Sequence, residues 1–175
     1  MKIFLSSVLI CLSFSCTPQK NILKLSKEIH QVSQTQLTNG RSTISIIPHK
    51  KAVLKKDAFN IGYVALEESK GSLFKFEFIK KVPGNLADAH YSEIIYIDFP
   101  ENFSEINTID LPLVATQILF GRFCYCKGQT GFYKVENSDF TAKMITKNRL
   151  KLALKFQIKQ VPHLISELKE DIHLK

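Results

Sequence analysis

Apolar and polar residues alternate with a period of two over long stretches of this chain. The longest such stretch covers residues 150–161, where the apolar side chains Leu150, Leu152, Leu154, Phe156 and Ile158 alternate with Lys151, Ala153, Lys155, Gln157 and Lys159. A helix would spread these charges around its circumference, whereas a strand places them on one face. The stretch is therefore predicted to be a strand with one apolar and one solvated face.

The same alternation recurs between turn signals about every ten residues. We predict further strands at residues 43–47, 61–66, 73–80, 92–99, 116–126, 130–135 and 140–144. Pro48 is expected to end the first of them, residues 49–57 to form a basic loop, and Gly128 to form a tight turn with positive φ. About eight strands without alternating helices predict a mainly β protein, an antiparallel sandwich or barrel. Residues 22–37 are predicted to form a short helix or an irregular strand.

The first residues have the build of a secretory signal peptide. Lys2 precedes an apolar run of about 13 residues that ends in small residues before Cys16, too short to span a bilayer. Leu12 and Ser13, with Ser15 before Cys16, resemble the lipobox of bacterial lipoproteins. That resemblance implies that Cys16 is acylated with diacylglycerol and becomes the first residue after cleavage. The alternative is an ordinary secreted protein in which Cys16 is a free or disulfide-bonded cysteine.

The resemblance also implies a domain organisation and a location. Residues 1–15 would be the signal peptide, residues 16–22 the lipidated cysteine and tether, and residues 23–175 a single β-rich domain. Such a protein belongs to the cell envelope, anchored to a membrane by lipid rather than inserted through it. Thr17 after the cysteine is compatible with the outer membrane in the sorting pattern of lipoproteins.

The net charge and the distribution of basic residues limit which kinds of binding partner are expected. Loss of Lys2 with the signal peptide lowers the formal net charge from +8 to +7. Along the predicted strand of residues 150–161, the lysines Lys151, Lys155 and Lys159 stand singly, which is typical of a solvated sheet face. No arginine-rich cluster is present, so we expect no nucleic acid as partner, but the membrane and an envelope protein or small ligand.

Cys124 and Cys126 are the two cysteines that would remain after cleavage and acylation. On a strand their sulfurs would face one way, with the Cα atoms about 7 Å apart, at or beyond the upper limit for an unstrained disulfide. A bond between them would therefore need a bulge or bend and would be easily reduced. Three interpretations stay open: small half-buried side chains without function, bonded or not; a soft-metal site formed by Cys124 and Cys126 with His90 or His163; and a redox-active pair. A pocket that contains both cysteines and a histidine would favour thiol chemistry.

No motif nominates a catalytic residue or a cofactor. The five histidines lack metal-site spacing, and neither a nucleophile elbow nor a phosphate-binding glycine loop is present. Asp88 and His90, near Tyr91 and Glu93, form the densest polar group, and because they follow Pro83, Gly84 and Asn85 they are expected to lie in an exposed loop. We therefore expect a non-catalytic binding or structural module, with a thiol-dependent metal-binding or redox protein as the alternative, and leave an enzyme of unnamed reaction as the third class.

Overall fold

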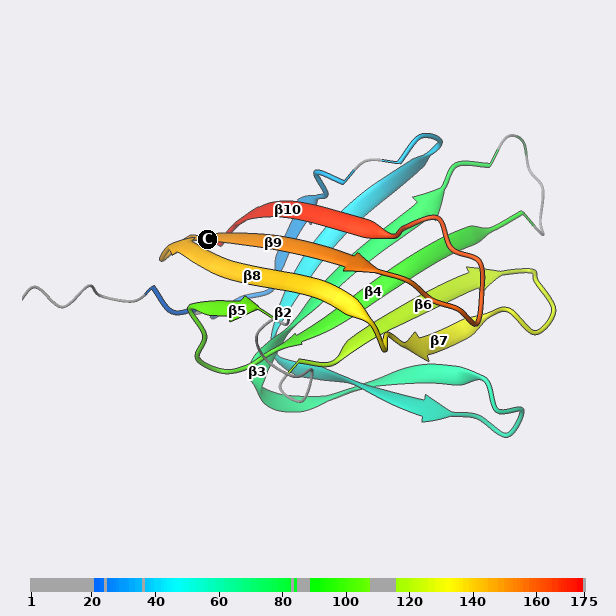
Figure 1. The fold of residues 1–175 in the computed structure, drawn as a ribbon, viewed down its shortest axis with the longest axis horizontal. Coiled ribbons are helices and arrows are strands. Elements are labelled where there is room, and N and C mark those ends of the chain that lie inside the picture. The colour runs from blue at the N-terminus through cyan, green and yellow to red at the C-terminus, as the bar shows by residue number, and fades with distance from the viewer. Residues whose placement is uncertain are drawn as a thin grey trace, which may run out of the picture.

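The fold is an all-β sandwich of two antiparallel sheets, which confirms the predicted fold class (Figure 1). The computed structural model describes residues 21–23, 25–35, 37–82, 84, 89–107 and 116–174. The strands are β1 (Ile29–Val32), β2 (Gly40–Lys56), β3 (Gly62–Lys80), β4 (Tyr91–Phe99), β5 (Glu105–Asn107), β6 (Ile118–Cys124), β7 (Gly131–Lys134), β8 (Ser138–Thr146), β9 (Arg149–Phe156) and β10 (Glu167–His173). The six-stranded sheet has the order β1-β2-β3-β4-β6-β7, and the four-stranded sheet the order β10-β9-β8-β5.

The core lies between the two sheets. Alternate residues of each strand face inward and are buried, as the period of two in the sequence requires. The six-stranded sheet contributes Ile44, Ile46, Phe74, Phe76, Phe78, Ile95, Ile97 and Phe120, and the four-stranded sheet contributes Phe140, Leu150, Leu152, Leu154, Phe156, Leu168 and Ile172. Each of these side chains stabilises the fold by about 2 kcal/mol relative to an exposed one.

Strands β2 and β3 form a long hairpin, and only residues 72–79 of β3 pair with β4. The distal half of the hairpin packs on the outer face of the six-stranded sheet, where Ala52, Leu73 and Leu119 are the buried centre of a second, smaller cluster. Near the hairpin tip, a Cβ added to Gly62 would lie 2.1 Å from the carbonyl oxygen of Phe132, so only glycine permits this approach.

The expectation that Pro48 ends a strand and that residues 49–57 form a loop is wrong. Pro48 is paired with Ser72 inside β2, and the register shifts between Pro48 and Lys50. Because β1 pairs only with residues 43–46, β2 has one neighbour at Pro48. A proline without an N–H is tolerated at such a bulged, half-paired position.

Other boundaries are confirmed or corrected by the strand pairing. The predicted turn at Gly128 has the expected positive φ, 72°, between β6 and β7. Residues 29–32 are a strand paired with β2, and no helix is found in the part of the chain that the structure describes. Strand β9 ends at Phe156 instead of residue 161, and the sequence did not predict β5 and β10.

The two ends of the sandwich differ in what they carry. At the end where Asn21–Leu23 enter, the N–H of Leu23 donates to the carbonyl of Phe103, and Asn21 donates to the carbonyl of Ile145. We call this the N-terminal end. The opposite end carries the turn between β6 and β7 and the connection between β9 and β10 (Figure 1). The predicted signal peptide and Cys16 lie outside the described residues, and none of the described residues forms a helix long and apolar enough to cross a membrane.

Candidate functional site

Cys124 and Cys126 are joined by a disulfide at the end opposite the N-terminal end. Strand β6 ends at Cys124, and the chain bends at Tyr125, so the two Cα atoms are 5.2 Å apart. This corrects the expected separation of about 7 Å, which assumed that the strand continues through Cys126. The observed spacing lies within the usual range for a disulfide, about 4.4–6.8 Å. We call this region, with the turn that follows to Thr130, the disulfide end.

Hydrogen bonds hold the turn that carries the disulfide. The N–H of Gln129 donates to the carbonyl of Cys126 at 3.1 Å. The buried guanidinium of Arg122 donates through one nitrogen to the backbone oxygen of Gln129 at 3.2 Å and to its side-chain oxygen at 2.9 Å. Thr130 donates to the carbonyl of Arg122 at 3.2 Å. The backbone around Cys126 is therefore fixed to β6 by the side chain of Arg122.

A pocket of about 310 Å³ adjoins the disulfide. Its described lining residues are Lys80, Lys81, Val82, Ala89, His90, Tyr91, Cys124, Tyr125 and Cys126. The structure thus brings His90 to the two cysteines, as one of the sequence hypotheses required. Both cysteines are half-buried, and Lys80, Lys81 and His90 are exposed around them.

The electrostatics of this pocket favour anions. Lys80 and Lys81 line it, and no acidic side chain is found among the described residues of its wall. Reactive cysteines are characteristically found in electropositive and partly exposed surroundings, because a nearby cation stabilises the thiolate. The surroundings of Cys124 and Cys126 have both properties.

A buried carboxylate lies behind the pocket. Glu93 of β4 is fully buried, opposite Arg122 in the register of β4 and β6. It accepts hydrogen bonds from the backbone N–H groups of Leu164 at 2.6 Å and Ile165 at 2.9 Å, which belong to the connection between β9 and β10. The hydroxyl of Tyr91 also donates to it. Glu93 therefore fastens a loop of one sheet to the inner face of the other.

Glu93 lies in a strand, as predicted, but the burial of its side chain was not predicted from the sequence. Of the polar group around Asp88, His90 is exposed as predicted, but Tyr91 and Glu93 belong to β4 and point inward, and Asp88 lies outside the described residues. The signal was present in the sequence, since Glu93 has the same parity as Ile95 and Ile97 on the apolar face of that strand. A charged residue on an apolar face must find buried partners.

Tyr91 connects the pocket with this buried network. Its ring lies under the guanidinium of Arg122, with 5.5 Å between the guanidinium carbon and the ring centroid. Burial, together with the hydrogen bond to Glu93, raises the pKa of Tyr91 to about 12. The phenol therefore keeps its proton at neutral pH and acts as a hydrogen-bond donor.

His163, the other histidine considered as a metal ligand, lies elsewhere. Its Nε2 accepts a hydrogen bond from the N–H of Ile158 at 3.1 Å, so its Nδ1 carries the proton and donates to the carbonyl of Ile165 at 2.8 Å. The ring stacks on Phe156, with the ring centroids 5.5 Å apart. Both ring nitrogens are therefore used in holding the β9–β10 connection.

The metal hypothesis for Cys124 and Cys126 stays a prediction for the reduced protein. Soft metals bind thiolates, whereas the two sulfurs are bonded to each other here. No group of three or more His, Cys, Asp or Glu side chains that could hold a metal ion is found within the described ranges.

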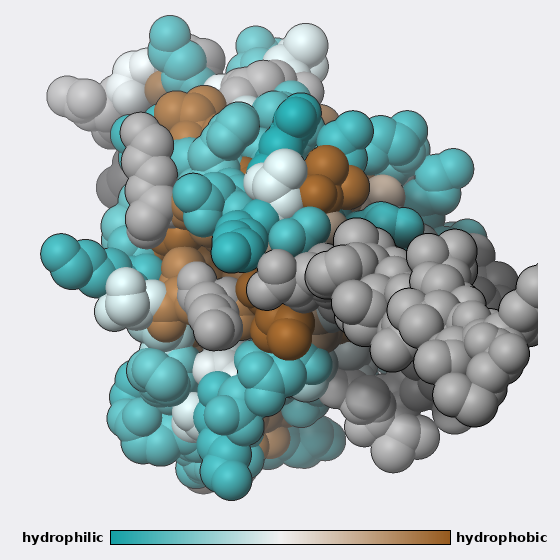
Figure 2. All heavy atoms as spheres, turned by 90° about the vertical axis from the view of Figure 1, so that its left-hand side faces the viewer, coloured by the Kyte–Doolittle hydropathy of each residue, from teal (hydrophilic) through white to brown (hydrophobic). Residues whose placement is uncertain are grey.

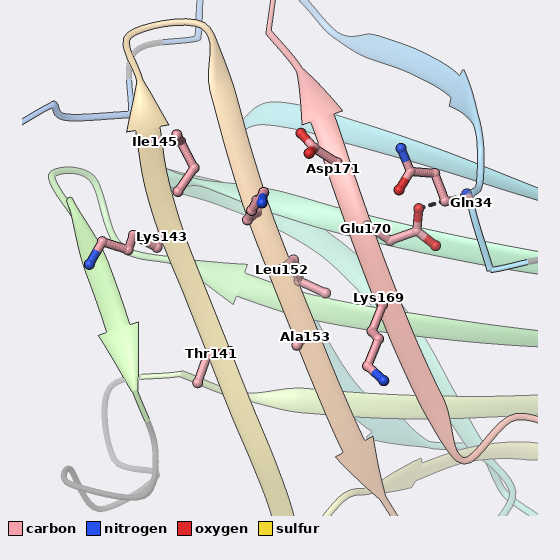
Figure 3. A pocket seen from close by; sticks show the side chains of 10 residues that line it. Gln34, Thr141, Lys143, Ile145, Leu152, Ala153, Lys169, Glu170 and Asp171 are labelled. Carbon is pink, nitrogen blue, oxygen red and sulfur yellow. Dashed lines mark hydrogen bonds between the residues drawn. The ribbon is translucent and has the colours of Figure 1, made fainter.

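A larger hollow, about 450 Å³, lies on the outer face of the four-stranded sheet (Figure 3). Its lining includes Lys143, Lys151 and Lys169 together with Thr141 and Ala153. Several charges on this face are paired, as in Lys143–Glu105 at 3.1 Å, Lys169–Glu167 at 2.5 Å and Arg149–Asp171 at 2.6 Å. This is the solvated sheet face that the alternation around Lys151 predicts.

Comparisons with known proteins give no family for this chain: no family model matches it, and neither a curated protein nor a solved structure matches it. The candidate site is therefore judged on its own chemistry.

Proposed function

We propose that this protein is a lipid-anchored protein of the cell envelope whose Cys124–Cys126 disulfide takes part in thiol–disulfide exchange. The observation that carries the proposal is a half-buried disulfide in a basic pocket with His90. A compartment outside the cytoplasm, which the signal-like N-terminus favours, permits such disulfides to form and persist. The lipid on Cys16 would leave these two cysteines as the thiols of the mature chain.

The exchange step balances with a partner dithiol as the reductant. A thiolate of the partner attacks one sulfur of the pair, the Cys124–Cys126 bond breaks, and a mixed disulfide forms while the other sulfur leaves as thiolate. The second thiol of the partner then attacks the mixed disulfide. The partner leaves oxidised, and Cys124 and Cys126 remain as a dithiol that has gained two electrons and two protons. Lys80 and Lys81 would stabilise the thiolates during both steps.

Trapping of the mixed disulfide tests this proposal. In the native host, Cys124→Ser or Cys126→Ser leaves one unpaired sulfur, and one of the two variants is expected to accumulate a covalent adduct that dithiothreitol removes. The double variant is the matched control and forms none. Absence of an adduct from both single variants, together with a disulfide that a glutathione buffer does not reduce, would contradict the proposal.

The surrounding charge gives a second measurement on the purified protein. Lys81→Gln is expected to slow the reaction of the reduced pair with a small disulfide by roughly two- to fivefold, because an exposed cation is worth less than 1 kcal/mol to a nearby thiolate. Lys127→Gln, an exposed lysine of the turn that does not line the pocket, is the matched control and should react as the natural protein does.

A second candidate function is non-catalytic binding of an envelope protein through Tyr125. Its side chain is 84% exposed, although it stands between the two bonded cysteines. A tyrosine on a backbone held in one conformation loses little entropy on binding, which is typical of an interface anchor. A photoreactive phenylalanine analogue at position 125 should then crosslink to one discrete protein in the host, whereas the same analogue at exposed Lys155 should not.

The anchor itself is tested separately. Labelled palmitate is expected to enter the protein in its native host, and Cys16→Ala is expected to abolish both the label and retention in the membrane fraction. A Cys16→Ala variant that stays as firmly in that fraction would overturn the proposed location without touching the exchange chemistry.

A further inference from the structure

The chain enters the sandwich at the end remote from the disulfide. Leu23 is buried, and its backbone N–H donates a hydrogen bond to the carbonyl of Phe103. The ring of Phe103 stacks on that of Phe99, with 4.9 Å between the two centroids. Phe99 is the last residue of β4, and Tyr91, which pairs with Cys124, is the first. Eight residue steps of β4 therefore separate the N-terminal end from the disulfide end, about 26 Å at a rise of about 3.3 Å per residue.

The connection from Cys16 to the fold is shorter than this distance. Five residue steps lead from Cys16 to Asn21, which donates a hydrogen bond to Ile145. Even fully extended, five steps reach about 18 Å. A lipid on Cys16 would therefore keep the N-terminal end close to the bilayer, whatever conformation the connecting residues adopt.

The surface of the N-terminal end has the composition of a membrane contact. Ile22 and Ile145 are each 38% exposed, and Lys147 is exposed in the turn between β8 and β9. Figure 2 shows this end, with hydrophobic side chains exposed between hydrophilic ones. Exposed Glu101 carries the opposite charge near this end.

We infer that the N-terminal end, with Ile22, Ile145 and Lys147, is the surface that rests on an anionic lipid bilayer, and that the disulfide end points away from it. The inference rests on the proposed lipidation of Cys16, but not on the exchange chemistry of the cysteines. Each lysine near an anionic surface contributes about 1 kcal/mol, and partly buried isoleucines add apolar contact with the interface. The disulfide and Tyr125 would then meet partners from the surrounding compartment and not from the plane of the membrane.

The absence of tryptophan from the chain provides a direct test. Lys147→Trp and Lys127→Trp each introduce one tryptophan at an exposed lysine in a turn, the first at the N-terminal end and the second at the disulfide end. The lipidated variants, purified from the native host, are placed in vesicles of phosphatidylglycerol and phosphatidylethanolamine that contain lipids brominated near the headgroup. Quenching at position 147 is expected to exceed that at position 127 at least about threefold, because contact quenching does not extend along a sandwich about 26 Å long.

Other outcomes have defined meanings. Equal quenching at both positions would mean that the domain lies flat, and quenching at neither would mean that it stands free of the lipid; both overturn the inference. Ile145→Trp repeats the measurement if Lys147→Trp unfolds. Flotation of the protein with the vesicles is measured in parallel. A protein that does not float, or a Cys16→Ser variant that floats equally well, would contradict the lipid anchor at Cys16, and flotation thus distinguishes this failure from a wrong orientation. Quenching at position 147 should weaken in purely zwitterionic vesicles.

Discussion

The two ends of the sandwich close the same core in different ways. On the inner face of β4, Phe99 at the N-terminal end stacks on Phe103. The ring centroids of Phe99 and Phe140 are 6.4 Å apart. Six residues earlier on that face, Glu93 at the disulfide end is held by hydrogen bonds from Leu164 and Ile165. Apolar contacts tolerate small shifts, whereas each buried polar group needs its own partner. At the disulfide end, individual hydrogen bonds therefore fix the geometry of the core. The same end carries the half-buried disulfide at the surface.

The largest expected effect comes from the apolar end. Phe103→Ala removes a ring that is 5% exposed and stacked on Phe99, and should lower the free energy of unfolding by about 4 kcal/mol through lost burial and a cavity. Urea unfolding monitored by circular dichroism measures it. The matched control is Phe59→Ala at a side chain that is 85% exposed, which should change stability by less than about 0.5 kcal/mol. Equal losses of unfolding free energy in the two variants would mean that Phe103 does not close the N-terminal end of the core.

The buried carboxylate should come next. Glu93→Ala leaves the N–H groups of Leu164 and Ile165 and the hydroxyl of Tyr91 without their acceptor, and should cost about 3 kcal/mol. Hydrogen exchange should show faster exchange at those two amides in particular. Glu101→Ala, at an exposed position, is the control. Unchanged protection of Leu164 and Ile165 would mean that Glu93 does not hold the loop.

The disulfide should contribute less to stability than its position suggests. A loop of three residues restricts the unfolded chain only slightly, so the double variant Cys124→Ser with Cys126→Ser should lose about 1.5 kcal/mol. Urea unfolding with and without dithiothreitol measures this, because reduction should destabilise the natural protein and leave the double variant unchanged. A loss above about 4 kcal/mol would make the bond a structural staple and weaken the exchange proposal.

The smallest effect is a pH dependence at Tyr91. Its pKa is raised from 10.0 to about 12, so the folded state holds the phenolic proton more tightly than the unfolded chain. Stability from this difference is fully present below pH 10 and is lost as the pH rises through about 12. After allowance for solvent screening it amounts to about 1 kcal/mol. Tyr91→Phe should therefore remove about that much of the fall in stability between pH 9 and pH 11.5, measured by urea unfolding at both values. Other tyrosines titrate in both proteins, so an identical fall in the two would contradict the assignment.

The sequence carried part of the candidate site. The pairing of Cys124 with Cys126 and the proximity of His90 were both among its hypotheses, and exposed Lys151 and Lys155 were predicted from alternation. Its error at Cys126 was to extend a strand through Tyr125, because periodicity does not mark where a strand bends. It also could not choose between His90 and His163, since that choice depends on which loop reaches β4.

Local sequence determined part of the secondary structure, because side-chain alternation and glycine turns act over a few residues: β4 and the turn at Gly128 follow from it directly. Tertiary structure alone decided that Pro48 sits inside a strand, that the β2–β3 hairpin packs on the outer face, and that Glu93 binds backbone groups 71 and 72 residues away. The physical reason is that the period of two assigns each side chain to a face, whereas what covers that face is chosen by packing and hydrogen bonding between segments far apart in the chain.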